Sequence, residues 1–226
     1  MTFSLIFMGL LSQNLLLPGI YHGEEITSPP GSTYWAVFSG PETDHLEQTQ
    51  LVLKAYNDPI FDSENEATGK AVSVIGPHQP LFMVTGIPDL KPGPLQRVAI
   101  QESSILLGKK IEIPWKDETH LLMWQKSSGK SEYPNIANYD LVYVAGKQQQ
   151  ILGQFEVYAP DGQDPMLASE GQPTLIWAGD LNRDGNLDLL IDMTDHYNVS
   201  EPTLFLSLAN ASTPVKKVCW FRTTGC

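Results

Sequence analysis

The sequence predicts a mainly β protein built from antiparallel sheets, sandwiched or barrel-like, with few short helices. Three observations predict this class. The 226 residues include 17 Pro and 18 Gly, a content that favours many turns over long helices. Short runs of branched and aromatic residues recur along the chain, separated by turn-forming residues. The sequence contains no heptad pattern and no tandem repeat.

The bulk composition indicates a globular chain that can bury a core. Hydrophobic residues make up 42% of the chain and charged residues 18%, which argues against a disordered protein. The formal net charge of −12 argues against binding to nucleic acid or to anionic membrane surfaces.

Residues 1–22 resemble a signal peptide. The apolar run Phe3–Leu11, followed by Leu15–Leu17, is too short and too interrupted by polar amides for a spanning helix. No Lys or Arg precedes the run and no A-x-A cleavage site is present, so an apolar segment retained in the fold is the alternative. A signal peptide predicts a secreted or periplasmic β-rich domain over residues 23–226, with no stable membrane insertion after signal removal.

Strand-like runs follow in order from residue 34. A short helix over Asp44–Tyr56 competes with a strand there, and Gly86–Pro94 is a candidate internal boundary because it is rich in Pro and Gly. The expected strands are Tyr34–Phe38, Gln50–Tyr56, Ala71–Ile75, Leu81–Thr85, Arg97–Ile100, Ile105–Ile113, His120–Trp124, Tyr139–Val144, Gln150–Tyr158, Thr203–Ser207 and Lys217–Phe221.

The stretch Trp177–Asp192 has the pattern of a calcium loop. Its candidate ligands, at loop positions 1, 3, 5, 7 and 9, are the side chains of Asp180, Asn182 and Asp184, the main-chain carbonyl of Asn186, and the side chain of Asp188. Gly185 at position 6 permits the sharp turn that returns position 9 to the ion. Because Ca²⁺ takes about 6–8 oxygen ligands, these five groups and water suffice. The alternative is a solvated acidic turn, since Asp-Gly is common in turns.

The flanks distinguish this loop from an EF-hand. An EF-hand would have Glu at position 12 and a helix on each side, whereas position 12 is Ile191 and the flanks Pro173–Ala178 and Leu187–Ile191 are strand-like. A D-x-[DN]-x-[DN]-G-x-x-D loop between strands resembles the calcium loop of FG-GAP repeats, the β-propeller repeats of integrin-type proteins. The resemblance covers Ile176 to Ile191 and implies Ca²⁺ in a strand–loop–strand turn. It does not imply a propeller, because no second copy is present.

The segment from Trp177 to the C-terminus is also similar to that of uncharacterised bacterial secreted proteins, a resemblance that implies export and no activity. Its two cysteines, Cys219 and Cys226, are separated by six residues that include Gly225. Export would permit a disulfide that holds the C-terminus in place. The alternative is two unrelated thiols, and the spacing does not indicate a redox or zinc site.

A second polar cluster follows the loop. Asp192, Asp195, His196 and Tyr197 could form a catalytic site, since His titrates near neutral pH. Such residues are also common where a strand ends in a turn, so structural support of the calcium loop, with Asp192 bonded to the loop backbone, is the favoured interpretation.

Three functional hypotheses follow. The leading one is a non-enzymatic exported protein in which Ca²⁺ stabilises the strand–loop–strand near the C-terminus. The second is a calcium-dependent adhesion or ligand-binding module for a glycan or a protein. The third is an envelope hydrolase that uses Asp192, Asp195 and His196 beside the metal.

Overall fold

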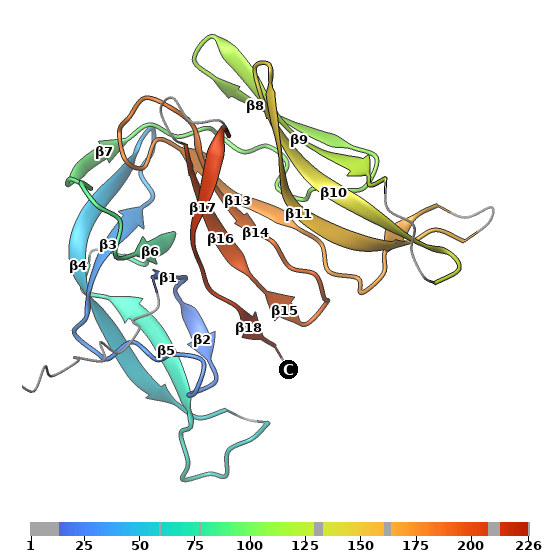
Figure 1. The fold of residues 1–226 in the computed structure, drawn as a ribbon. Coiled ribbons are helices and arrows are strands. Elements are labelled where there is room, and N and C mark those ends of the chain that lie inside the picture. The colour runs from blue at the N-terminus through green and yellow to red at the C-terminus, as the bar shows by residue number, and fades with distance from the viewer. Residues whose placement is uncertain are drawn as a thin grey trace, which may run out of the picture. The chain divides into compact units, whose positions relative to one another are not determined.

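The computed structural model describes residues 14–58, 60–76, 78–128, 133–160, 164–207 and 213–225. Within these ranges the chain forms strands β1 to β18 and no helix (Figure 1). The strands pair in antiparallel sheets, so the predicted mainly β class is confirmed. Over the same ranges, no helix of the length and hydropathy needed to cross a membrane is found.

The chain divides into two compact units. Unit 1 comprises the described residues up to Phe38 together with Glu47–Gly86, and unit 2 comprises Ser39–Leu46 and Ile87–Cys226. The last boundary falls at the start of the Pro- and Gly-rich stretch Gly86–Pro94. A short piece of unit 2 therefore stands in sequence between the two parts of unit 1.

Unit 1 contains an antiparallel sheet in the order β1-β6-β3-β4-β5-β2. Its core includes Tyr34 and Ala36 of β3 and Val72 of β5, whose neighbours Trp35, Ala71 and Ser73 are only partly buried. The strands are β1 (Leu15–Leu16), β2 (Gly19–Tyr21), β3 (Thr33–Phe38), β4 (Asp44–Tyr56), β5 (Gly69–Val74) and β6 (Phe82–Val84).

The competing helix over Asp44–Tyr56 is wrong. The whole stretch is the 13-residue strand β4, and its second half, Leu51–Tyr56, pairs with β5. The β-branched residues Thr49 and Val52 favour this pairing over a helix.

The end of the predicted signal peptide lies in the sheet of unit 1. Leu15 and Leu16 form β1, pair with Val84 and Met83, and have no exposed surface. Residues 1–13, which carry the first part of the predicted signal, lie outside the described residues, so the signal peptide stays a prediction.

Unit 2 contains a five-stranded sheet and a four-stranded sheet. The five-stranded sheet has the order β12-β11-β10-β9-β8 and the four-stranded sheet has the order β13-β14-β16-β17. The strands are β8 (Lys110–Trp115), β9 (Glu118–Lys126), β10 (Ile136–Ala145), β11 (Gln148–Tyr158), β12 (Met166–Leu167), β13 (Thr174–Gly179), β14 (Asp188–Asp192), β16 (Pro202–Ser207) and β17 (Val215–Trp220), with β7 (Gly93–Leu95) paired to the start of β4, and β15 (Val199–Ser200) paired to β18 (Thr223–Thr224).

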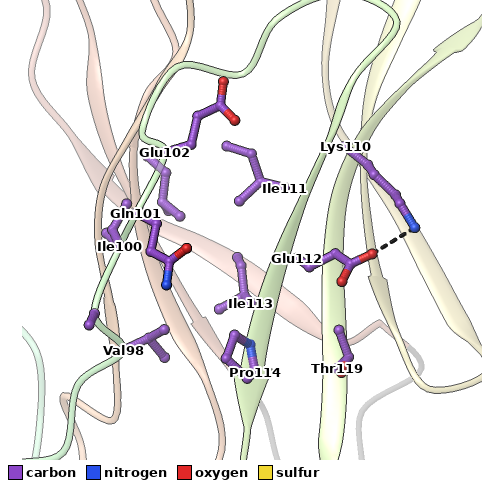
Figure 2. Close-up of a pocket in the computed structure, with 12 residues that line it drawn as sticks. Val98, Ile100, Gln101, Glu102, Lys110, Ile111, Glu112, Ile113, Pro114 and Thr119 are labelled. Atoms are coloured by element: carbon purple, nitrogen blue, oxygen red, sulfur yellow. Dashed lines mark ion pairs between the residues drawn. The ribbon is translucent and has the colours of Figure 1, made fainter.

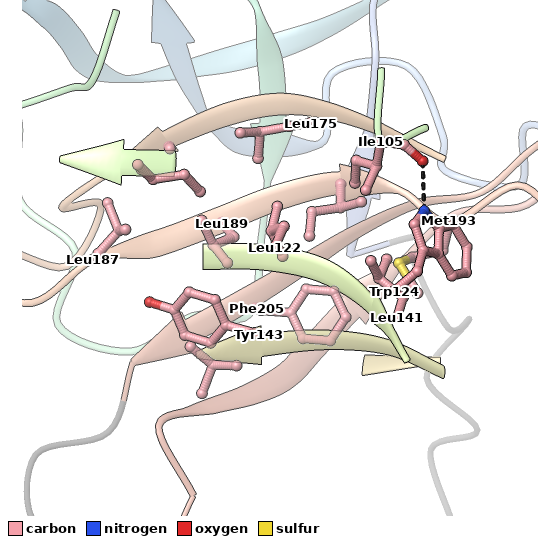
Figure 3. Packing of buried hydrophobic residues seen from close by; sticks show 14 of the residues in the cluster. Ile105, Leu122, Trp124, Leu141, Tyr143, Leu175, Leu187, Leu189, Met193 and Phe205 are labelled. Atoms are coloured by element: carbon pink, nitrogen blue, oxygen red, sulfur yellow. Dashed lines mark hydrogen bonds between the residues drawn. The ribbon is translucent and has the colours of Figure 1, made fainter. Parts of the chain in front are cut away.

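The two larger sheets of unit 2 share one hydrophobic core. Leu122 and Leu141 from the five-stranded sheet and Leu189 and Phe205 from the four-stranded sheet belong to a single buried cluster (Figure 3). Both sheets of unit 2 therefore face one core, within the antiparallel β class that the sequence predicts.

Two expected strands differ from the structure. Arg97–Ile100 is not a strand, and only the second half of Ile105–Ile113 enters β8. The segment from Arg97 to Ser104 runs along β13 and pairs with it only through isolated bridges at these two residues. Ile105 is nevertheless buried, because its carbonyl accepts a hydrogen bond from Trp124 Nε1 at 2.8 Å and its side chain joins the core (Figure 3).

A buried ion pair joins three parts of unit 2. Asp44, which has no exposed surface, lies with Oδ1 3.2 Å from Arg97 Nε, and its Oδ2 accepts a hydrogen bond from Trp177 Nε1 at 2.8 Å. Arg97 also donates to the carbonyl of Gly40 at 3.1 Å. The start of β4, the segment after β7 and strand β13 therefore meet at one carboxylate.

Candidate metal centre

The predicted calcium loop is the turn of a β-hairpin. β13 and β14 pair antiparallel up to Gly179 and Asp188, so the expected strands on both sides are confirmed. Within the turn, Arg183 and Gly185 have φ of 59° and 88°. Glycine adopts this left-handed backbone without strain, which explains its place at loop position 6.

The carboxylates of the loop differ in burial. Asp188 has no exposed surface and Asp180 is 7% exposed, whereas Asp184 is exposed. Asp180 accepts hydrogen bonds from the backbone N–H groups of Asp184 (3.0 Å) and Gly185 (2.9 Å), and Asp188 Oδ2 accepts one from Leu181 N–H (2.8 Å). The two buried carboxylates therefore hold the turn in its conformation from inside.

Ser207 connects two of the carboxylates. Its Oγ lies 3.0 Å from Asp188 Oδ1 and 3.2 Å from each carboxylate oxygen of Asp184, and its N–H donates to Asp188 Oδ1 at 2.8 Å. Ser207 is the last residue of β16, the strand beside β14. The loop is thus attached to a third strand, which loop spacing cannot reveal because Ser207 is 19 residues from Asp188.

The surroundings of the buried loop carboxylates disfavour their ionised forms. The pKa of Asp188 is raised to about 7, mainly by burial and to a smaller extent by the nearby Asp184, against the hydrogen bonds from Ser207 and Leu181. Burial, with Asp184 again contributing, also raises the pKa of Asp180. None of the salt bridges found in the described ranges involves these three carboxylates.

The nearby cationic side chains contact main-chain carbonyls instead. Lys116 Nζ donates to the carbonyl of Gly185, which also accepts Trp115 Nε1 at 3.2 Å. Arg183 donates to the carbonyl of Pro92 at 3.2 Å. These contacts fix the outer side of the turn to the β8–β9 turn and to the residues before β7.

The structure brings the predicted ligands together only in part. Asp184 and Asp188 meet at Ser207, while Asn182 donates through Nδ2 to Asp184 Oδ2 at 3.2 Å and accepts the Asp184 N–H through its own Oδ1 at 3.1 Å. The N–H of Asn186 donates to Asp184 Oδ1 at 2.8 Å. In the described part of the chain, no group of three or more His, Cys, Asp or Glu side chains is arranged to hold a metal ion.

The donor set nevertheless suits a hard cation. A carboxylate has about four lone-pair positions. Hydrogen bonds occupy three of them on Asp180, where the Arg183 N–H also donates, and three on Asp188. Each buried carboxylate therefore keeps acceptor capacity beyond what the protein uses.

The second polar cluster does not form a combined site. Asp192 accepts hydrogen bonds from Thr194 N–H, Glu201 N–H and Ser200 Oγ in the turn after β14. These donors differ from the expected one, which was the backbone of the calcium loop. Among the described residues, no hydrogen bond joins Asp192, Asp195 and His196. These contacts suit a strand-ending turn and leave the hydrolase hypothesis without geometric support.

The outer members of that cluster also have partners of their own. Asp195 pairs with Arg222 at 2.8 Å, and the ring of His196 contacts the side chain of Asn198. Tyr197 is exposed beside the His196 ring. Each of these side chains is accounted for by a local contact.

Only one of the two cysteines of the predicted disulfide lies in the described structure. Cys219 is buried on β17 as a free thiol, and burial raises its pKa to about 12. Cys226 lies outside the described residues, so the pairing of the two cysteines stays a prediction.

Comparison with family models, with curated proteins and with solved structures finds no match to this chain.

Proposed function

We propose that the chain is an exported, non-enzymatic protein in which one Ca²⁺ ion in the Asp180–Asp188 loop stabilises unit 2. The observation that carries this proposal is the buried carboxyl of Asp188, which lies near the charge of Asp184 and in the described structure forms no ion pair. A buried charge without a partner is costly, and a divalent cation beside it removes that cost.

The ligands in this proposal are the side chains of Asp180, Asn182, Asp184 and Asp188 and the main-chain carbonyl of Asn186. Binding requires Asp184 to exchange part of its contact with Ser207 for the ion. This change is available because Asp184 is exposed and lies on the solvent side of the turn.

The ion would connect strands β13 and β14 directly, and β16 through Ser207. Extracellular calcium modules have dissociation constants on the order of 10⁻⁴ to 10⁻³ M, which suits an exported protein. At a calcium concentration about a hundred-fold above the dissociation constant, binding adds about 2.7 kcal/mol to the free energy of unfolding.

The test is thermal unfolding in calcium and in chelator. We expect chelator to lower the Tm of the wild-type protein, by roughly 5–11 °C for a domain of this size. In Asp184→Ala the Tm should become insensitive to calcium, whereas Asp164→Ala, which removes an exposed carboxylate outside the loop, should keep the wild-type response. Equal Tm values for the wild type in calcium and in chelator would contradict the proposal.

A further inference from the structure

Two hollows of similar size lie in unit 2, and they differ in how their charges are paired. One, of about 450 Å³, lies between β8 and the segment Val98–Glu102 (Figure 2). There Lys110 Nζ lies 2.7 Å from Glu112, and Glu102 lies 4.0 Å from Lys109. Because these acidic side chains already have cationic partners, the first hollow shows no preference for a charged ligand.

The second hollow, of about 440 Å³, lies beside β12 and is called the β12 hollow here. Most of its lining is aliphatic, and part of it is continuous with the core of unit 2, since Leu167 belongs to the buried cluster and Leu107 packs against it. The residues that line it are Leu106, Leu107, Pro165, Met166, Leu167, Glu170 and Gln172. An apolar concavity of this size suits a small organic ligand.

Backbone hydrogen bonds hold both walls of the β12 hollow. On one side, Lys109 N–H donates to the carbonyl of Leu106 at 3.1 Å. On the other, Glu170 N–H donates to the carbonyl of Leu167 at 3.1 Å, and Leu167 pairs with Val157 of β11. The hollow is therefore largely formed before a ligand binds, which lowers the entropy cost of binding.

The polar atoms that the β12 hollow offers to a ligand are acceptors. Among the described residues that line it, Glu170 is the one charged side chain, and in the described ranges its carboxylate makes no ion pair. Gln172 donates through Nε2 to the carbonyl of Ile105 at 2.7 Å, which leaves its Oε1 as the available atom. A carboxylate and an amide oxygen beside aliphatic walls are complementary to a cationic N–H donor on an apolar body.

We propose that the β12 hollow binds a small aliphatic primary amine in its ammonium form. The ammonium donates to Glu170 and to Oε1 of Gln172. The hydrocarbon chain lies against Leu106, Leu107 and Met166, and Met166, which is 54% exposed and unbranched, can adapt to it. An anionic ligand would oppose the charge of Glu170, and a neutral alcohol would leave that charge without a partner. Amine binding here does not require that the loop bind calcium.

The experiment follows the backbone amide NMR shifts of the full chain as n-hexylammonium is added, with 1-hexanol and hexanoate as probes of the same chain length. We expect saturable shifts at Leu106, Leu107 and Leu167, with a dissociation constant on the order of 10⁻³ M for a ligand of about seven non-hydrogen atoms. Hexanol should bind at least about threefold more weakly, and hexanoate more weakly still, because neither supplies a positive charge to Glu170.

Charge-neutral variants test the role of Glu170. Glu170→Gln should abolish the preference for hexylammonium over hexanol, because it removes the carboxylate and keeps the shape of the side chain. The matched control Glu156→Gln removes an exposed carboxylate of β11 that does not line the β12 hollow, and it should keep the preference. Both variants change the net charge equally, so the comparison separates the β12 hollow from the overall charge of −12.

Absence of saturable shifts, equal affinity of the wild type for hexylammonium and hexanol, or an equal loss of preference in Glu156→Gln would overturn the proposal. So would tighter binding of Nα-acetyl-lysine methylamide than of hexylammonium, which would assign the β12 hollow to a lysine side chain of a protein partner.

Discussion

Asp188 combines complete burial with a carboxyl group that the protein does not neutralise with a cationic side chain in the described ranges. Its hydrogen bonds from Leu181, Ser207 N–H and Ser207 Oγ favour the ionised form, but burial outweighs them and raises the pKa to about 7. The folded protein therefore binds a proton at this position more readily than the unfolded chain does.

The sign of the pH effect follows from the raised pKa. Without calcium, the stability contributed by protonated Asp188 is present at acidic pH and is lost as the pH rises through about 7. Between about pH 5.5 and about pH 8 the free energy of unfolding should fall by roughly 2 kcal/mol from this group alone. Urea unfolding in chelator at the two pH values measures it.

One variant makes this pH measurement specific to Asp188. Asp188→Asn removes the titrating proton, so the fall between the two pH values should shrink by about the same amount, even though the variant loses a hydrogen bond and is less stable throughout. An unchanged pH dependence in that variant would assign the effect to other groups.

At the residue scale, the sequence predicts the residues of the loop better than the residues that contact it. The alternation of Asp180, Asn182 and Asp184 and the glycine at 185 lie within one turn, so local spacing suffices to find them. Ser207 and Trp115 contact the same loop from 19 and 70 residues away along the chain. Tertiary packing brings these residues to the loop, and no local pattern identifies them.

At the scale of the strands, local sequence again predicts some elements, while tertiary contacts decide others. The runs that become β9, β10, β11 and β16 are predicted from their apolar content alone. Arg97–Ile100 has an equally strand-like sequence, but it pairs with β13 only through an isolated bridge at Arg97, so it does not form a strand. Strand propensity states that a segment suits a sheet, while pairing depends on what the fold places beside it.

The ion pair of Asp44 and Arg97 should matter more to unit 2 than any surface pair. Asp44→Ala removes the negative charge beside the Arg97 guanidinium and the acceptor of the Trp177 Nε1–H hydrogen bond, so the free energy of unfolding should fall by about 3–5 kcal/mol. Denaturant titration of unit 2, followed by Trp fluorescence, measures the change.

An exposed pair provides the matched control for Asp44. Asp195→Ala breaks the contact with Arg222, and because both side chains of this pair are about half exposed, it should cost less than about 1 kcal/mol. Adding Arg97→Met to Asp44→Ala removes the unpaired charge and should restore part of the loss. Similar costs for Asp44→Ala and Asp195→Ala would show that the buried pair has no special weight.

At the scale of the whole molecule, the chain divides into two compact units. Pro and Gly in Gly86–Pro94 point to a boundary in that region. The earlier crossings, after Phe38 and after Leu46, have no such signal because they are set by which residues pack together. Composition and turn residues suffice for the class of the fold, but contacts distant in sequence determine how it is partitioned.

The division into units predicts where calcium acts. All contacts found for the loop, including those to Lys116, Pro92 and Ser207, lie in unit 2. Chelation should therefore speed amide hydrogen exchange in β13, β14 and β16 and leave the buried strand β6 of unit 1 unchanged. Equal acceleration in β6 would show that the ion stabilises both units.

Because segments of the two units alternate along the chain, one break in the gene cannot separate the units. A cut after Gly86 would leave Ser39–Leu46 on the N-terminal fragment and take Asp44 away from the Arg97 and Trp177 that surround it. Recombination at a single junction could therefore transfer neither unit intact. Gene fusion or domain shuffling would have to transfer both together, as one heritable block.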